Sequence, residues 1–333
     1  MTHTAIAPLH VIVGAGQVGP FIAERLLAQG LRVRLVRRGS FESTPAGAEP
    51  VRADASDPAQ AKEALRGASV VYHTGNPRYH RWSQELLPLA RGILAGTSAA
   101  GARLVVLDNL YSYEVPSDGR LTETTRVAPS SKKGALRAEA AALLLDAHAR
   151  GEAPVAIVRG SDWVGPGVHN SVLGERFWTK LFAGKAVELM AGADHPHTYT
   201  YAPDAAAALV TLGLASDDAY GQVWHAPALP AETTRAWMGR FAELAGRPLK
   251  TQVLTPFVLR VAGLFMPEAV EIPEMMYQWQ TPFILDDAKF RRRFGSAPTD
   301  QETVVRETFA WAAARFGAPH RRAARVPTAA SAL

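Results

Sequence analysis

The chain has 333 residues, of which 47% are hydrophobic and 20% are charged, and it contains no cysteine. This length and hydrophobic content allow a sizeable core, as one large domain or two unequal ones, and exclude a disordered or fibrous protein. The absence of cysteine excludes disulfides, Cys-ligated zinc and thiolate catalysis. No hydrophobic run approaches the ~20 residues of a membrane-spanning helix, and the N-terminus shows no secretory pattern. We therefore expect a cytoplasmic protein without a membrane partner.

The formal net charge is +5 and the sequence pI is about 9.5. The basic residues are spread along the chain, with short clusters at 37–38, 291–293 and 321–322. This distribution favours solvated surface over a nucleic-acid site, so no nucleic-acid partner is expected. The histidines at 169, 195, 197 and 225 form no compact ligand set, and we predict no metal site.

Strand and helix patterns alternate through the first half of the chain. The predicted strands are 9–13, 33–36, 51–53, 69–72, 104–107 and 155–158. The predicted helices between them are 21–29, 58–66, 82–101 and 132–150. Repeated strand–helix units of this length indicate a parallel sheet with right-handed crossovers.

After residue 159 the regular alternation of predicted strands and helices ends. Glycine and proline gather in 160–174, a composition typical of a loop that lines a site. The later predicted elements are helices at 174–183, 203–214, 231–245, 256–265, 267–278 and 301–316, and a strand at 222–225. Residues from 318 onward lack hydrophobic periodicity and are predicted to form a flexible tail.

Three glycines, Gly14, Gly16 and Gly19, form a G-x-G-x-x-G sequence between the first predicted strand and the first predicted helix. In this context the first glycine permits a tight turn, the second lets the backbone approach a pyrophosphate, and the third lets helix and strand pack closely. The start of the helix, which includes Gln17 and Val18, offers free N–H groups to the phosphates. We therefore predict a dinucleotide site here.

The end of the second strand carries Arg37 and Arg38 where a carboxylate would favour NAD. Guanidinium groups suit a 2′-phosphate, so NADP is the expected cofactor, with NAD possible. The alternative is that one or both arginines face solvent. Asp54, just after the third strand, is a candidate contact to the adenine amino group, or else a loop or capping residue.

Together these features resemble an extended or atypical short-chain dehydrogenase/reductase of the NAD-dependent epimerase/dehydratase family. The similarity spans roughly residues 9–317. Beyond the glycine motif it is carried by 53–54, 105–113, 132–134, 164–167 and 197–204, and by Asp286, 294–295, 298–299 and Trp311.

The resemblance implies an α/β fold with a Rossmann-type doubly wound parallel sheet and a smaller, mostly helical C-terminal region that binds substrate. Residues 1–165, together with 195–228, would form the dinucleotide-binding domain. Residues 166–194 and 229–317 would form the substrate-binding region, followed by the tail at 318–333. It also implies a homodimer through the helices 82–101 and 132–150.

The family normally pairs a Tyr with a Lys four residues later on one helix face, but Pro129 lies four residues before Lys133. Asn109, with Asp108, replaces the usual Ser or Thr after the fifth strand. We expect Tyr111 to act as proton donor, Asn109 to orient it, and Lys133 to bind the nicotinamide ribose and support proton transfer. The alternative for Tyr111 and for its neighbour Tyr113 is a half-buried aromatic role.

The loop after the fourth strand is rich in side chains that could touch a ligand. Thr74, Gly75 and Asn76 are predicted to contact the cofactor. The predicted substrate contacts are Tyr79, Trp82, Tyr113, Trp163 and His169. The alternative is a capped turn whose aromatic side chains pack on the next helix.

The leading functional hypothesis is an NADPH-dependent reductase of a carbonyl or conjugated group in a fairly apolar small molecule. Large hydrophobic side chains could line its pocket, although core packing is an alternative for most: Trp163, Phe177, Trp178, Met275, Met276, Tyr277, Trp279 and Phe283. A nucleotide-sugar epimerase or dehydratase is the second hypothesis, with Arg176, Lys180 and Lys185 as candidate diphosphate ligands. A non-catalytic NADP-binding redox sensor is the third, and the missing Tyr favours it.

Overall fold

A seven-stranded, entirely parallel sheet forms the centre of the molecule, in the order β12-β7-β5-β4-β1-β2-β3. The structure is a computed structural model that describes residues 7–41, 43–255, 257–259 and 272–317. The strands are β1 (Leu9–Val13), β2 (Arg32–Arg37), β3 (Ala48–Arg52), β4 (Ala68–His73), β5 (Arg103–Asn109), β7 (Val155–Gly160) and β12 (Gln222–His225). The predicted Rossmann-type fold class is confirmed.

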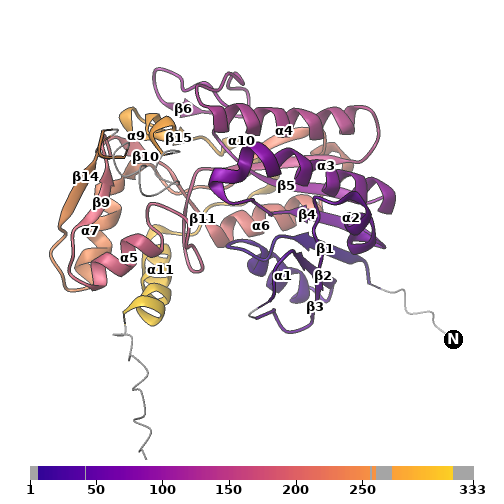
Figure 1. Cartoon of the computed structure of the whole chain (residues 1–333), viewed down its shortest axis with the longest axis horizontal. Helices are drawn as coiled ribbons and strands as arrows, with labels where there is room; N and C mark the ends of the chain where they lie inside the picture. The colour runs from indigo at the N-terminus through magenta and orange to yellow at the C-terminus, as the bar shows by residue number, and fades with distance from the viewer. Residues whose placement is uncertain (1–6, 42, 256, 260–271, 318–333) are drawn as a thin grey trace, which may run out of the picture.

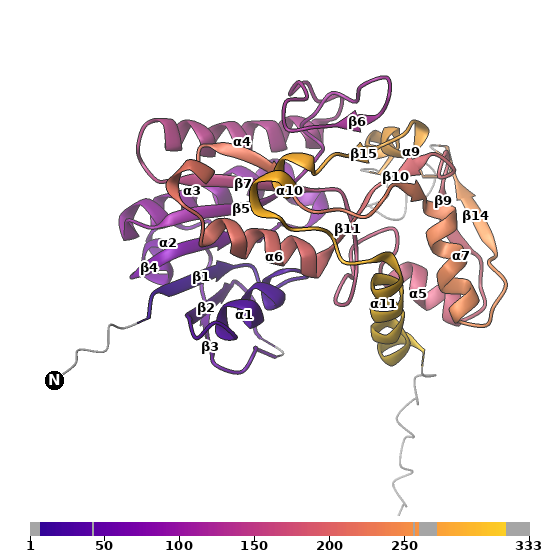
Figure 2. The same ribbon diagram turned by 180° about the vertical axis from the view of Figure 1, so that it is seen from behind.

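Helices cover both faces of this sheet (Figure 1). One face carries α1 (Gly19–Leu27) and α6 (Ala202–Gly213), which lie side by side, and Figure 2 shows them from behind. The other face carries α2 (Pro58–Leu65), α3 (Trp82–Ala100) and α4 (Lys132–Ala149). This arrangement leaves the carboxyl ends of the strands at one edge, where α/β sheets form their ligand sites.

Strand β1 shows why the sheet has two hydrophobic cores. All five of its residues are buried. Successive side chains of a strand point to opposite faces, so Ile12 packs in the core with α1 and α6. Its neighbours Val11 and Val13 pack with α3 and α4 on the other face. A strand covered on both sides needs this continuous hydrophobic run.

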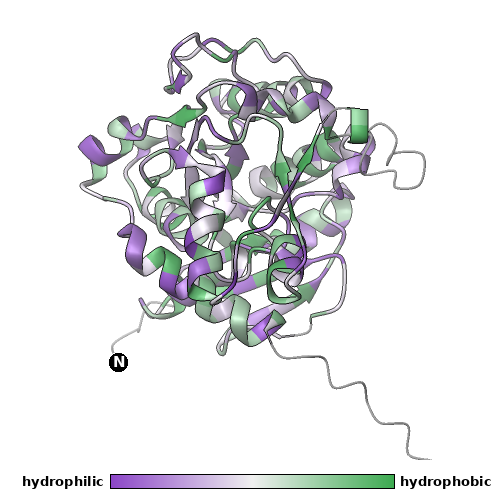
Figure 3. Cartoon of the chain, turned by 90° about the vertical axis from the view of Figure 1, so that its left-hand side faces the viewer, coloured by the Kyte–Doolittle hydropathy of each residue, from purple (hydrophilic) through white to green (hydrophobic). Residues whose placement is uncertain are grey.

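A separate core holds the C-terminal region together. Trp178 of α5 (Glu175–Phe182) packs against Phe241 of α7 (Thr234–Leu244), with the ring centroids 4.7 Å apart. α11 (Gln301–Phe316) adds Val304 and Ala312 to this core. These helices are striped with hydrophobic and hydrophilic segments in Figure 3, as expected of helices that bury one side. The strands β9 (Val187–Met190) and β14 (Thr251–Leu254) pair at its outer side.

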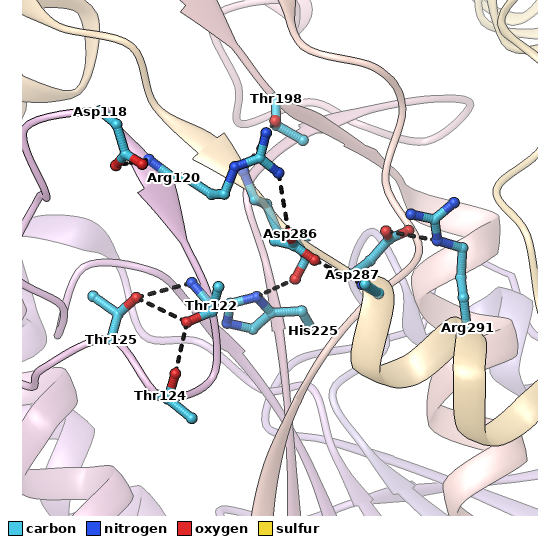
Figure 4. Close-up of polar contacts among 12 residues, drawn as sticks. Asp118, Arg120, Thr122, Thr124, Thr125, Thr198, His225, Asp286, Asp287 and Arg291 are labelled. Atoms are coloured by element: carbon cyan, nitrogen blue, oxygen red, sulfur yellow. Dashed lines mark hydrogen bonds and ion pairs between the residues drawn. The ribbon is translucent and has the colours of Figure 1, made fainter.

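Short strands connect the two regions. β8 (Asp162–Val164) pairs with β11 (Tyr199–Tyr201), β10 (Pro196–His197) with β13 (Glu232–Thr233), and β15 (Ile284–Leu285) with β6 (Arg120–Leu121). Figure 4 shows how the segment after β15 is held: Arg120 pairs with Asp286 at 3.0 Å, and His225 Nδ1 donates to the Asp286 carbonyl at 2.9 Å. The remaining elements are η1 (Tyr79–Arg81), η2 (Asp217–Ala219), η4 (Pro273–Met275), α9 (Tyr277–Gln280) and α10 (Ala288–Phe294).

Some predicted elements differ from the observed ones. The predicted helix 231–245 begins only at Thr234, because Glu232 and Thr233 pair with β10 and the Thr233 hydroxyl accepts from Ala236 N. The predicted loop 160–174 contains strand β8, and the sequence analysis did not predict α10. Most of the predicted helix 256–265, the first part of 267–278 and the tail 318–333 lie outside the described residues. Within the described ranges, no helix has the length and hydrophobicity to cross a membrane.

Candidate active site

The glycine-rich turn has the close contacts that the motif requires. Gly14 has φ +119°, and a Cβ there would lie 2.5 Å from the backbone nitrogen of Gly75. A Cβ on Gly19 would lie 2.0 Å from the Gly14 carbonyl oxygen, so strand and helix approach closely at this point. A Cβ on Gly16 would meet nothing within 4 Å. The turn therefore leaves open space at Gly16, where the backbone of a dinucleotide site must receive the pyrophosphate.

Two residues predicted to touch the cofactor instead bind the protein. Thr74 donates from its hydroxyl to the Gly14 carbonyl at 2.9 Å, which ties the end of β4 to the glycine turn. The Gln17 side-chain oxygen accepts from the backbone N–H groups of His169 and Asn170, at 2.8 and 2.6 Å. Gln17 thus holds the loop after β8 beside the turn.

The ring of His169 faces α11 rather than the glycine turn. It packs edge-on against Trp311, with centroids 5.3 Å apart, and its Nδ1 lies 3.4 Å from the Glu175 carboxylate. The imidazole therefore contacts α11 and Glu175 in this structure, and the substrate contact of His169 remains a prediction.

The predicted 2′-phosphate site contains one exposed guanidinium. Arg38 is 62% exposed and lies 3.9 Å from Asp54 and 3.6 Å from Glu85. Arg37 lies over the Phe41 ring at 5.7 Å. The Asp54 carboxylate accepts from the backbone N–H and the hydroxyl of Ser56, and these bonds, the hydroxyl first, lower its pKa. Asp54 therefore shapes its own turn, and the NADP preference remains a prediction.

Asp108, at the end of β5, balances two buried guanidinium groups. Its Oδ2 accepts from Arg159 Nε at 3.0 Å, and its Oδ1 lies 3.6 Å from Arg137. Two desolvated cations require a nearby anion, which a Ser or Thr at this position would not supply. The neighbouring Asn109 accepts the backbone N–H of Tyr111 at 3.1 Å, so it orients the Tyr111 backbone rather than the phenol.

Arg137 of α4 is a site residue that was not among those predicted. It lies four residues after Lys133, so the helix face that carries Tyr and Lys in the resembled family carries Lys and Arg here. Arg137 donates to the Asn76 side chain at 2.8 Å and lies 4.2 Å over the Trp82 ring. The spacing of Lys133 and Arg137 was the available signal, and it places a second cation beside the loop that follows β4.

Lys133 faces η1 and η4. Its Nζ donates to the Tyr79 carbonyl at 3.0 Å, lies 4.2 Å over the Tyr79 ring, and is 4.0 Å from the Glu274 carboxylate. The start of α4 positions it: Ser131 caps the helix by accepting from Gly134 N. A Cβ on Gly134 would lie 2.2 Å from the Tyr111 carbonyl oxygen, so glycine permits the close approach of helix and loop. The ribose-binding and catalytic roles of Lys133 remain predictions.

Two predicted substrate contacts are buried, as in the alternative in which these aromatic side chains pack within the protein. Tyr113 is 2% exposed, its hydroxyl bonds His225 Nε2 at 3.0 Å, and Arg159 lies 4.4 Å over its ring. Trp82 is also 2% exposed and donates its indole N–H to the Pro77 carbonyl. Both rings lie in the core and contact a guanidinium group of the site: Tyr113 contacts Arg159, and Trp82 contacts Arg137. Trp163 is half-buried, with its ring against Gly160.

Three partly exposed tyrosines and one carboxylate gather from four separate segments. We call Tyr79, Tyr111, Tyr277 and Asp162 the tyrosine cluster. Burial raises the pKa of Tyr111 and of Tyr277, and in each the Asp162 carboxylate is the next cause. Burial likewise raises the pKa of Tyr79, followed by Tyr111 and Asp162. These phenols stay protonated at neutral pH, so they can donate hydrogen bonds but cannot accept a substrate proton.

Most of the large hydrophobic side chains considered for a pocket have the other role given for them, core packing. Core packing buries Phe177, Trp178, Met275, Met276, Trp279 and Phe283 to 5% exposure or less. Tyr277 remains half-buried in the tyrosine cluster. The candidate diphosphate ligands Arg176 and Lys180 both pair with the Glu188 carboxylate, Arg176 at 2.5 Å.

The family assignment follows from comparison with known proteins. The model of the NAD-dependent epimerase/dehydratase family matches residues 10–224, more than half of the chain. The glycine turn and the parallel sheet both lie in this span. The chain belongs to the NAD-dependent epimerase/dehydratase family. A comparison with curated protein sequences gives no match.

Many solved structures share the fold. A Thermus thermophilus UDP-glucose 4-epimerase in complex with NAD has 21% identity and a TM-score of 0.72, over 91% of this chain and 98% of that one. A dTDP-glucose 4,6-dehydratase from Streptomyces venezuelae, with NAD bound, has 19% identity and a TM-score of 0.74, over 91% and 96%. An epimerase of Methanothermobacter thermautotrophicus has 16% identity and a TM-score of 0.76, over 92% of both chains.

Proposed function

We propose that this protein is a nicotinamide-dinucleotide-dependent enzyme that oxidises, transiently or in net terms, a hydroxyl-bearing carbon of a small molecule. Its structural neighbours include a UDP-glucose 4-epimerase and a dTDP-glucose 4,6-dehydratase, both with NAD. The observation that carries the proposal is the contact of the glycine turn with Gly75, in the loop that leads directly to Tyr79 of the tyrosine cluster. A dinucleotide on the turn would thus lie near side chains suited to hydroxyl chemistry.

The residues present fit a dinucleotide. The open space at Gly16 accepts a pyrophosphate, and the strained Gly14 brings the turn against Gly75. When bound, the dinucleotide supplies a nicotinamide ring that accepts or returns a hydride. Arg37 and Arg38 support NADP over NAD, since an exposed guanidinium at the end of β2 suits a 2′-phosphate.

The polar character of the tyrosine cluster favours oxidation of a hydroxyl over reduction of an apolar carbonyl compound. Protonated phenols bind the oxygen of a hydroxyl or carbonyl group. The hydrophobic side chains expected to hold an apolar substrate are instead packed in the core. We further propose a cytoplasmic homodimer, formed through the outer layer that α3 and α4 provide.

The test combines cofactor binding with turnover. Fluorescence titration of the purified chain with NADPH and NADH measures cofactor affinity. Absorbance at the nicotinamide band then follows oxidation of sugars, polyols, UDP-glucose and dTDP-glucose, and reduction of a set of apolar ketones and enals. Oxidation of any hydroxyl substrate supports the proposal. Activity on apolar carbonyl compounds alone supports a reductase instead, binding without turnover supports a sensor, and absence of binding overturns all three.

A further inference from the structure

A buried imidazole–carboxylate pair lies behind the tyrosine cluster. His197, at the end of β10, is fully buried, and its Nε2 lies 2.8 Å from Asp162 Oδ2. Its Nδ1 lies 3.2 Å from the Gln278 carbonyl oxygen. The ring is stacked on Trp279 at 5.3 Å and 6° and on Phe283 at 5.4 Å and 18°. Contacts on both nitrogens and two aromatic stacking partners fix the imidazole in one orientation.

The hydrogen-bond partners decide how many protons the pair holds. A carbonyl oxygen only accepts, so His197 Nδ1 must carry a hydrogen. An ionised carboxylate also only accepts, so a second proton lies between His197 Nε2 and Asp162 Oδ2. The pair is net neutral, which makes its burial tolerable, whereas removal of either member would leave an uncompensated charge.

Only one of the two Asp162 carboxylate oxygens, Oδ2, is engaged by His197. Within the described part of the chain, no hydrogen bond engages Oδ1, and the side chain is 15% exposed. The Asp162 carboxylate acts electrostatically on Tyr79, Tyr111 and Tyr277, so it lies close to all three phenols. Asp162 therefore has an acceptor oxygen available beside three hydrogen-bond donors.

Among the described residues, two other carboxylates near this site, Glu274 and Asp108, already have partners. Glu274 accepts from the backbone N–H of Lys132 at 2.9 Å through Oε2, and its Oε1 lies 4.0 Å from Lys133. Asp108 lies between two guanidinium groups and is 6% exposed. An ion pair that served only to join β8 to β10 would not need a partly exposed carboxylate that acts electrostatically on three partly exposed tyrosines.

We propose that Asp162, as a carboxylate held by the His197 imidazolium, is the base that takes the proton of the substrate hydroxyl, and that His197 is its positioning residue. The role rests on the proposed function, which supplies the hydride acceptor. When bound, the oxidised nicotinamide ring would accept the electron pair of the substrate carbon–hydrogen bond as a hydride. The oxygen–hydrogen bond breaks as its proton moves to Asp162 Oδ1, and a carbon–oxygen double bond forms. The protonated phenols donate hydrogen bonds to the substrate oxygen throughout.

The first experiment replaces the carboxylate. Asp162→Asn keeps the shape of the side chain but cannot accept a proton. With whichever sugar, polyol or nucleotide sugar the wild type oxidises, we expect kcat to fall by about 100-fold or more, with NADPH affinity within twofold. Asp194→Asn is the matched control, because it removes an exposed carboxylate that pairs with Arg235 at 2.7 Å, and its kcat should stay within twofold.

The second experiment measures where the protons of the His197–Asp162 pair lie, without any turnover of substrate. Nitrogen NMR of the chain labelled with ¹⁵N-histidine, with NADPH bound, should show both His197 ring nitrogens protonated at pH 7.5. The signal should become that of a neutral ring in Asp162→Asn. His197→Gln should lower kcat, because the carboxylate loses the side chain that positions it.

The outcomes separate the two proposals. An active wild type with an equally active Asp162→Asn variant overturns the role of Asp162 and leaves the proposed function intact. A neutral His197 in the wild type also overturns it, because the proton would then reside on Asp162. If the wild type binds NADPH but oxidises no substrate in the panel, the proposed function fails and the role of Asp162 fails with it.

Discussion

The strongest stability prediction concerns Asp108→Asn, which removes the charge that balances Arg137 and Arg159. The Arg159 side chain is 3% exposed and the Arg137 side chain 11% exposed, so both guanidinium groups are largely withdrawn from water. Breaking a buried ion pair by removing one partner costs about 3–5 kcal/mol. Asparagine keeps an oxygen that can accept from Arg159 Nε, so we expect a loss near the lower figure, about 3 kcal/mol. Such a loss is a large share of the roughly 5–15 kcal/mol that stabilises a typical domain.

Urea unfolding followed by far-UV circular dichroism measures this loss. With an m-value of about 3 kcal/mol/M, 3 kcal/mol lowers the unfolding midpoint by roughly 1 M. Asp217→Asn is the control, since its carboxylate pairs with Arg103 at 2.6 Å but is 84% exposed. A surface pair of this kind contributes under about 1 kcal/mol. If the two variants lower the midpoint equally, the buried charges are not balanced in the way we describe.

Four further expectations follow from the site and the fold. Arg38→Ala and Arg37→Ala should each weaken NADPH binding about ten- to a hundredfold, since a charge-assisted bond contributes roughly 1.5–3 kcal/mol, and leave NADH binding unchanged in titrations. Tyr111→Phe should lower turnover roughly 100-fold by removing a hydrogen-bond donor, with NADPH affinity unchanged. Burial lowers the pKa of His225 to about 3, so only the unfolded chain takes up this proton between pH 6.5 and 3. The free energy of unfolding should therefore decrease as the pH is lowered through that window. In urea titrations, His225→Gln should weaken this dependence of the free energy of unfolding on pH. Sedimentation at micromolar concentration should give twice the 35.8 kDa chain mass.

Each of these has a result that contradicts it. Equal affinities of the wild type for NADPH and NADH would refute the 2′-phosphate site. Wild-type turnover in Tyr111→Phe, on a substrate whose chemistry limits the rate, would remove the phenol from the mechanism. An unchanged pH slope in the His225 variant would show that other groups control acid unfolding. A species of single-chain mass would exclude the dimer.

The local patterns of the sequence were sufficient for the fold and for the glycine turn. The continuous hydrophobic run of β1 requires a strand covered on both faces. Ile12 and Val13 pack in opposite cores because successive side chains of a strand point to opposite faces. Gly14 and Gly19 are needed for contacts within a few residues of themselves and with the next strand end. Such features depend on backbone geometry and side-chain periodicity, which neighbouring residues determine, and the family resemblance extended them to the whole sheet.

Only the tertiary structure decided which polar side chains are available to a ligand. Tyr111 and Tyr113 are two residues apart and were both predicted site residues, yet Tyr113 bonds His225, 112 residues away, and is buried. The role proposed for Asp162 depends on its contact with His197, which in turn contacts the Gln278 carbonyl, and these residues come from two other segments. A side chain's exposure, hydrogen-bond partners and electrostatic surroundings come from contacts between distant parts of the chain. No local pattern in the sequence encodes those contacts. The sequence therefore determined the strands and turns that frame this site, and the folded chain determined which side chains are available to a ligand.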